Sequence, residues 1–280
     1  DRSVATAEIH AEIADRLREE LDYAREAAHM RLYGTILENE PGVAVPQPFP
    51  ELSTGRLLTM TWLEGGPILD TAEAPLERRN EIALRMFRLW YVPFYYYGVI
   101  HGDPHLGNYT IAPDGRVNLL DFGCVRIFPP AFVKGVIDLY HALERNDREL
   151  AVEAYRSWGF GELSRDMIEV LNRWALFVYG PLLDDRARMI QEKATGRYGH
   201  ELVDSVHRDI RRLGGIAPPR AFVFMDRAAI GLGSVFLHLR AQINWHRLFH
   251  ELIDDFDDRA LARRQNRALR RAGVPAAAGR

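Results

Sequence analysis

Three oxygen-bearing side chains lie within the stretch from Val99 to Gly123. Asp103 is followed five residues later by Asn108 and, thirteen residues after that, by Asp121, which opens an Asp-Phe-Gly sequence. Moving a γ-phosphoryl group requires close positioning and charge neutralisation by Mg²⁺, a cation that prefers oxygen ligands. We therefore predict that Asp121 and Asn108 bind Mg²⁺ and that Asp103 orients or deprotonates the attacking oxygen. His101 would brace the loop.

A β-hairpin is needed to bring these residues together. Residues 109–112 and 117–120 read as short strands, and the turn sequence Pro113-Asp114-Gly115 separates them. Pairing of the strands would fold Asn108 back beside Asp121. An ordinary turn or strand end could produce either half of the pattern by chance. Both halves at this spacing, joined by a hairpin, favour a phosphoryl-transfer site.

The segment before the hairpin is predicted to hold one long helix and one strand. Residues 4–37 carry apolar side chains at four-residue intervals among dense charges, which is typical of an amphipathic helix. Residues 56–63 predict a strand, and Glu64-Gly65-Gly66 predict a flexible joint between two lobes.

The remainder is predicted to be largely helical. A buried helix should run from Pro75 to about Tyr97, with a kink at Pro93. Further helices are expected over residues 131–144, 148–158, 164–179, 192–213 and 220–255. Residues 259–280 hold a cluster of arginines and an Ala-Gly-Pro-rich end, which predicts a disordered basic tail that could touch anionic lipid headgroups.

Composition narrows the possible partners and compartments. The chain has 280 residues, 47% of them hydrophobic, and a net charge of −3, so nucleic acid is not an expected partner. A single cysteine, Cys124, fits a reducing compartment. The most apolar stretch, residues 221–243, carries charged side chains and is not expected to span a membrane. We expect a cytoplasmic chain whose membrane contact, where it occurs, is peripheral, at the inner face.

Three stretches together resemble the UbiB/AarF family of atypical, protein-kinase-like proteins. They are REELDYAREAA at residues 18–28, PFPELSTGRLLTMTWLEG at residues 48–65 and HGDPHLGN at residues 101–108. The resemblance implies a protein-kinase-like α+β fold with an incomplete small lobe over residues 1–66. A mostly helical large lobe carrying the hairpin would follow over residues 67–258.

The resemblance also implies a nucleotide site. Glu20 and Asp22 match the family's Glu-x-Asp motif near the nucleotide, and Glu26 matches the helix glutamate that pairs with a phosphate-binding lysine. Because they are four residues apart, Asp22 and Glu26 would share one helix face. Without the downstream motif, these residues would read as solvated charges on an amphipathic helix. The hinge strand would face the adenine through Met60, Thr61 and Leu63.

One departure from the family pattern concerns the groups that grip phosphate. The family's lysine, its phosphate-covering loop and its Lys-x-Gly-Gln element would all precede Glu26, yet no lysine precedes Lys134. The sequence is thus expected to be either the C-terminal portion of a longer protein or a shortened, inactive form. Its start within a predicted helix favours the first.

The function implied by the resemblance is an ATP-dependent kinase or ATPase that uses Mg²⁺ and supports isoprenoid quinone (ubiquinone) biosynthesis. Its partners would be a nucleotide and an isoprenoid lipid or quinone-biosynthesis proteins. Residues 125–130 lead almost directly into a helix, without the long peptide-docking segment of protein kinases, which favours a small-molecule or lipid-linked substrate or ATP hydrolysis alone.

Two other functions remain open. An aminoglycoside- or choline-kinase-like phosphotransferase shares the His-Gly-Asp loop, although the acidic cluster at residues 20–26 argues against it. A catalytically inactive pseudokinase or scaffold would explain the missing lysine.

Overall fold

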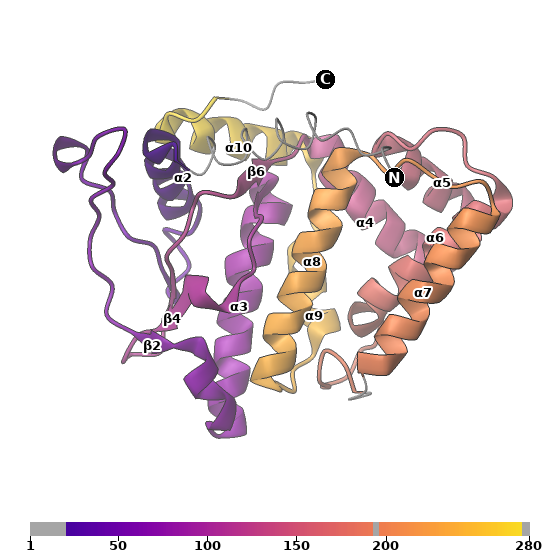
Figure 1. Cartoon of the computed structure of the whole chain (residues 1–280), viewed down its shortest axis with the longest axis horizontal. Helices are drawn as coiled ribbons and strands as arrows, with labels where there is room; N and C mark the ends of the chain where they lie inside the picture. The colour runs from indigo at the N-terminus through magenta and orange to yellow at the C-terminus, as the bar shows by residue number, and fades with distance from the viewer. Residues whose placement is uncertain (1–20, 193–195, 276–280) are drawn as a thin grey trace, which may run out of the picture.

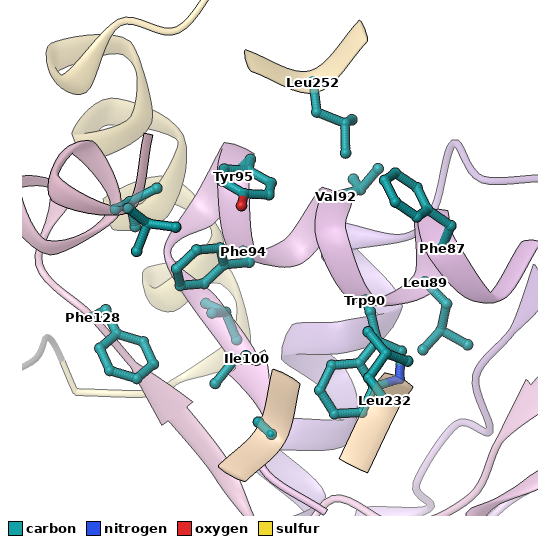
Figure 2. Close-up of a cluster of buried hydrophobic side chains, with 14 of the residues drawn as sticks. Phe87, Leu89, Trp90, Val92, Phe94, Tyr95, Ile100, Phe128, Leu232 and Leu252 are labelled. Carbon is teal, nitrogen blue, oxygen red and sulfur yellow. The ribbon is translucent and has the colours of Figure 1, made fainter. Parts of the chain in front are cut away.

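Helix α3, Leu76–Tyr97, runs through the middle of the molecule (Figure 1) in this computed structural model, which describes residues 21–192 and 196–275. Large apolar side chains are buried along its length, and Figure 2 shows Trp90 and Phe94 among them, with side chains from other elements gathered around. The helix continues through Pro93 and ends at Gly98, whose φ of 62° is a left-handed conformation that glycine adopts without strain.

Two small sheets lie against this helix. The first has the order β1-β5-β4-β2, formed by Val43–Ala44, Val117–Leu119, Tyr109–Ile111 and Gly66–Pro67. Strands β4 and β5 are antiparallel, which confirms the predicted hairpin. The second sheet pairs β3, Val99–His101, with β6, Val125–Ile127, and so joins the two ends of the motif stretch.

The first described helix, α2, spans Tyr23–Ile36 and is shorter than predicted. The side chain of Asp22 accepts a hydrogen bond from the backbone N–H of Arg25 at 3.0 Å, so Asp22 is an N-cap and the helix starts after it. A single helix over residues 4–37 is therefore wrong at Asp22, because this capping aspartate marks the start of α2. Residues 1–20 lie outside the described residues.

The hinge segment is also less regular than predicted. In place of a continuous strand over residues 56–63, the structure has isolated bridges between Pro48 and Met60 and between Thr54 and Leu57, with the short 3-10 helix η1, Pro50–Leu52, nearby. Side-chain hydrogen bonds explain the irregular backbone: the Ser53 hydroxyl donates to the Phe49 carbonyl at 2.8 Å.

Glu64-Gly65-Gly66 is held against the hairpin and does not form a free joint. Asn118, which is buried, donates from its amide nitrogen to the Glu64 carbonyl at 3.0 Å and to the Thr110 hydroxyl at 2.9 Å. A Cβ on Gly65 would lie 2.7 Å from that hydroxyl, so the close approach requires glycine. The 3-10 helix η2, Ile68–Glu73, then leads into α3.

The helices of the large lobe follow the hydrophobic pattern closely. They are α4 at Pro130–Arg145, α5 at Arg148–Ser157, α6 at Arg165–Tyr179, the 3-10 helix η4 at Gly180–Leu183, and α7 at Gly196–Arg212. The single helix expected over residues 220–255 is wrong: the structure has α8, Arg220–Leu239, and α9, Trp245–Ile253. Arg240 adopts φ 47° at the end of α8, and Asn244 caps α9.

Helix α8 passes a composition test for a membrane-spanning helix. By length and hydropathy alone it could cross a membrane, and 28% of its most apolar window is buried inside the structure. In the view of Figure 1 it runs between α3 and α7.

The basic C-terminal segment forms a helix where disorder was expected. Helix α10, Asp258–Ala272, lies alongside α2 (Figure 1) and buries Leu261, Gln265 and Leu269. The Arg31 guanidinium on α2 donates to the Ala272 carbonyl at 3.4 Å. The arginine-rich composition concealed the narrow apolar stripe that docks this helix.

Candidate phosphoryl-transfer site

His101 connects the two halves of the motif. Its Nε2 lies 2.5 Å from the backbone oxygen of Asp121, and its Nδ1 accepts from the backbone N–H of Asp103 at 3.4 Å. Burial lowers the pKa of His101, which favours the neutral ring that can donate at Nε2 while accepting at Nδ1. One buried side chain thus sets the position of both aspartates' backbones.

Asn108 is bound to Asp103 within the same loop. The Asn108 amide nitrogen donates to the Asp103 carboxylate at 2.9 Å and to its backbone oxygen at 3.2 Å. The Asn108 carbonyl accepts from the backbone N–H of Leu120 at 3.0 Å, which places Asn108 next to the residue that precedes Asp121. Asn108 is the last residue of the 3-10 helix η3, Leu106–Asn108. Because its amide nitrogen is bonded to Asp103, its amide oxygen is the side-chain atom that would bind a metal.

The Asp-Phe-Gly segment is held from two sides. The Asp121 carboxylate accepts from the backbone N–H of Gly123 at 2.8 Å. From α2, Glu26 accepts from the backbone N–H of Phe122 at 3.4 Å, and Nδ1 of His29 lies 3.1 Å from the backbone oxygen of Phe122. Two residues one helical turn apart therefore hold a single residue's backbone.

The electrostatics of Glu26 fit a site that takes up a cation. Burial raises the pKa of Glu26 despite the hydrogen bond from Phe122, and the charge of Asp121 raises it further. A cation near Glu26 would offset both of these effects and favour its ionised form. The carboxylate of Asp121 and the amide oxygen of Asn108 are hard oxygen donors that suit Mg²⁺, which commonly binds to one or two protein groups and to substrate phosphates.

The other predicted nucleotide-site residues differ in where they lie and in which of their atoms are already bonded. Glu20 lies outside the described residues. Asp22 caps α2, and its backbone oxygen accepts from the N–H of Glu26, four residues later, at 3.0 Å. Thr61 donates its backbone N–H to the Gln47 carbonyl at 2.9 Å, and its hydroxyl accepts from the backbone N–H of Gln47. Its backbone N–H is therefore already bonded, whereas Met60 and Leu63 lie half-buried on either side.

Some residues that shape the site were missed by sequence analysis. His29 follows Glu26 by three residues, a spacing that could have indicated a shared face. The packing of α8 against the loop had no sequence signal: a Cβ on Gly102 would lie 2.0 Å from the Phe224 ring, and one on Gly231 would lie 2.1 Å from Pro104. These glycines let α8 touch the loop that carries Asp103.

His246 and His250, both in α9, belong to a structural hydrogen-bond network. The Tyr140 hydroxyl lies 2.8 Å from Nε2 of His250, and Nδ1 of His246 lies 2.8 Å from the Leu182 carbonyl. Across residues 21–192 and 196–275, no group of three or more His, Cys, Asp or Glu side chains could hold a metal ion by itself. A metal at the candidate site would therefore take further ligands from phosphate or water.

The helical large lobe, the small mixed sheet and the hairpin-borne Asp/Asn/Asp site define a protein-kinase-like domain. The chain belongs to the ABC1 atypical kinase-like family, whose domain profile matches residues 2–155, in agreement with the UbiB/AarF resemblance.

Similar sequences come from several kingdoms. The chain is 30% identical over 142 residues to atypical kinase COQ8B, mitochondrial, of Danio rerio, covering 50% of this chain and 23% of that protein. It is 30% identical over 163 residues to atypical kinase COQ8, mitochondrial, of Saccharomyces cerevisiae, covering 57% and 31%. An uncharacterised Synechocystis protein is 29% identical over 182 residues, covering 58% and 45%. The chain therefore spans less than half the length of each of these relatives.

A solved structure shares the fold. The protein Rv3197 of Mycobacterium tuberculosis, determined in complex with erythromycin, aligns with a TM-score of 0.67 at 22% identity and covers 90% of this chain and 63% of that one. At this identity the likeness establishes the kinase-like fold, which confirms the predicted fold class.

Proposed function

We propose that this chain binds Mg²⁺ and ATP and takes part in phosphoryl transfer to a small-molecule or lipid-linked acceptor, or in ATP hydrolysis. The observation that carries the proposal is the pair of contacts made by His101, which join the Asp103 loop to the Asp121 segment. A preorganised set of oxygen groups is the main requirement of this chemistry.

In this proposal each residue has a separate task. Bound Mg²⁺ would neutralise charge on the phosphates, with Asp121 and Asn108 as its protein ligands. Asp103 is positioned by the Asn108 amide and by the backbone N–H of His105 at 3.3 Å. Its carboxylate would orient the hydroxyl of the acceptor, or water, and take up its proton.

The nucleotide-binding role is assigned to the hinge and to α2. Because the N–H of Thr61 is bonded to Gln47, we assign backbone contact with adenine to Leu63 and side-chain contact to Met60. Glu26, with Asp22 and Glu20 before it, would face the phosphates and their cations. In this family such a glutamate pairs with a phosphate-binding lysine that precedes it. The given sequence has no lysine before Lys134, and so none before Glu26.

A role in isoprenoid quinone biosynthesis, with a quinone-biosynthesis protein or isoprenoid lipid as partner and peripheral membrane contact, follows from membership of this family. The names of the two COQ8 relatives support that assignment. The complex of Rv3197 with erythromycin is an example of small-molecule binding by a protein of this fold, and it supports a small molecule as the substrate.

Binding of ATP measured by isothermal titration calorimetry, with and without Mg²⁺, tests the metal assignment. Asp121→Asn should weaken Mg²⁺-dependent ATP binding at least tenfold, because it removes the carboxylate charge. Asp114→Asn is the matched control, since Asp114 is an exposed carboxylate in the turn of the same hairpin and should leave binding unchanged. Equal binding by the wild type and Asp121→Asn would refute the site.

The rate of phosphate release from ATP measures turnover, and it therefore distinguishes a residue needed for the chemical step from one needed only for binding. Asp103→Asn should retain Mg²⁺-ATP binding, because an asparagine oxygen can still accept the bond from Asn108, and should lower turnover by about 10²- to 10⁴-fold. If Asp103→Asn turned over ATP at the wild-type rate, Asp103 would not be the catalytic base.

A further inference from the structure

A large apolar cavity lies in the helical lobe, away from the candidate phosphoryl-transfer site. Its volume is about 790 Å³, and its walls come mainly from α3, α6 and α8. Aromatic rings form much of the lining, including Trp90, Phe94, Trp174, Phe177 and Phe222. The residues of the candidate site, among them Asp103, Asn108 and Asp121, do not line it. A cavity of this size and lining is typical of a site for a small molecule.

The carboxyl group of Asp226, a half-buried residue, is the main polar feature of the α8 wall. The indole N–H of Trp174 on α6 donates to Oδ1 of Asp226 on α8 at 2.8 Å, across the cavity wall. Burial raises the pKa of Asp226, and the Trp174 hydrogen bond only partly offsets this. Burial therefore disfavours ionisation of this carboxyl, and in its neutral form the group can donate a hydrogen bond as well as accept one.

Apolar side chains remain exposed at the edge of the cavity. Leu176 on α6 is 45% exposed, and Ile230 and Leu237 on α8 are 46% and 43% exposed, and all three line the cavity. Exposed large apolar groups around a hollow mark a place where a ligand gains by covering them. The apolar composition of α8 thus has a local explanation in the cavity that it lines.

The opposite side of α8 contacts the loop that carries Asp103. Gly231 lies against Pro104, and Phe224 lies against Gly102 so closely that a Cβ on either glycine would overlap its neighbour. One face of helix α8 therefore lines the cavity, and the opposite face contacts the loop that carries Asp103. A molecule in the cavity would contact the helix that supports this loop.

We propose that this cavity binds an uncharged, largely apolar small molecule whose single polar group forms a hydrogen bond with Asp226. An uncharged ligand is favoured because most of the lining is aromatic and aliphatic, and burying an unpaired charge against it would be costly. The charged side chains of the lining are already paired within the protein: Arg173 with Asp209, Arg188 with Asp184 and Glu192 with Arg186. The proposal is independent of phosphoryl transfer, since no nucleotide is involved in this binding.

Nile red provides a suitable probe, because it is uncharged, mainly apolar and carries one carbonyl acceptor, and its fluorescence rises in apolar surroundings. The full chain is titrated with Nile red in the absence of nucleotide. Gly233→Phe should fill the cavity: Gly233 lines it, and no atom lies within 4 Å of a Cβ built there. We expect at least a tenfold weaker affinity. Ser234→Phe, at an exposed lining position on the same helix, is a second variant that should act in the same direction.

Gly34→Phe is the matched control. Gly34 is also in a helix and also has no atom within 4 Å of its Cβ position, but it does not line the cavity. The Gly34→Phe variant should bind Nile red with the same affinity as the wild type. Asp226→Leu should weaken binding about fivefold, as expected for loss of one hydrogen bond. Absence of Nile red binding to the wild type, unchanged binding to both filling variants, or equal loss in Gly34→Phe would overturn the proposal.

Discussion

Nε2 of His101 lies 2.5 Å from the backbone oxygen of Asp121, twenty residues further along the chain. This contact fixes the Asp-Phe-Gly segment relative to the loop that carries Asp103, and burial keeps the pKa of the ring low enough to favour its neutral form. We therefore interpret His101 as a positioning residue, which acts by holding Asp103 and Asp121 in place.

Replacing His101 with alanine should therefore affect both stability and binding. The variant loses two hydrogen bonds and leaves the half-buried carbonyl of Asp121 without this partner, which should lower the free energy of unfolding by about 2 to 3 kcal/mol and weaken Mg²⁺-ATP binding. Urea denaturation and calorimetry measure the two effects. His105→Ala is the control, because His105 is exposed in the same loop and should change stability by less than about 1 kcal/mol. Comparable losses in both variants would contradict a special role for His101.

The stability of the folded chain should depend on pH through His29. Burial lowers the pKa of His29 to about 4, whereas the unfolded chain has the ordinary value of about 6.5. Between these two pH values the unfolded state binds more protons than the folded state. The contribution of His29 to the free energy of unfolding is therefore fully present above about pH 6.5, and about 3 kcal/mol is lost as the pH falls toward 4.

The variant His29→Asn tests this assignment. It keeps a donor near the Nδ1 position for the Phe122 carbonyl but does not titrate. Denaturation curves at several pH values should show a shallower loss of stability than in the wild type, with the remaining slope including a contribution from His101, whose pKa burial also lowers. An unchanged slope would exclude His29 as the source.

Gln265 should be important for docking α10. Its amide nitrogen donates to the carbonyls of Tyr97 and Phe128 at 2.7 and 2.8 Å, and the side chain is buried. Gln265→Ala would leave both carbonyls without this donor and should cost about 2 kcal/mol in unfolding free energy. Asn266→Ala, at the neighbouring exposed position, should cost less than about 0.5 kcal/mol. Similar values for the two variants, measured by chemical denaturation, would contradict this role.

Asn118 should hold the hinge segment to the hairpin. In Asn118→Asp the donor is replaced by an acceptor that faces the Glu64 carbonyl, so we expect a loss of about 2 to 3 kcal/mol and faster amide exchange over residues 62–66. Hydrogen exchange followed by mass spectrometry gives the local change. Arg116→Gln is a control at an exposed position two residues earlier in the hairpin, and its exchange in the hinge should match the wild type. If amide exchange over residues 62–66 were the same in Asn118→Asp and the wild type, Asn118 would not be holding the hinge segment to the hairpin.

The sequence by itself determined the motif, the hairpin and most helices of the large lobe. Asp103, Asn108 and Asp121 follow one another at short range, and a turn signal between two short apolar segments is enough to predict that they approach one another. Apolar periodicity likewise located α3 to α6, because a helix that buries one face must repeat its large side chains at helical spacing. The family resemblance came from equally local patterns.

Only the tertiary structure decided how the site is held and what surrounds it. The contact of His101 with Asp121 and the bond from Asn118 to Glu64 join residues 20 and 54 positions apart. The contacts of Glu26 and His29 with Phe122 span 96 and 93 positions. Local composition made the segment of α10 look disordered, since the benefit of its apolar stripe exists only once α2 and α3 are in place. The cavity beside α8 is likewise a property of several packed helices, and no single segment of sequence encodes it.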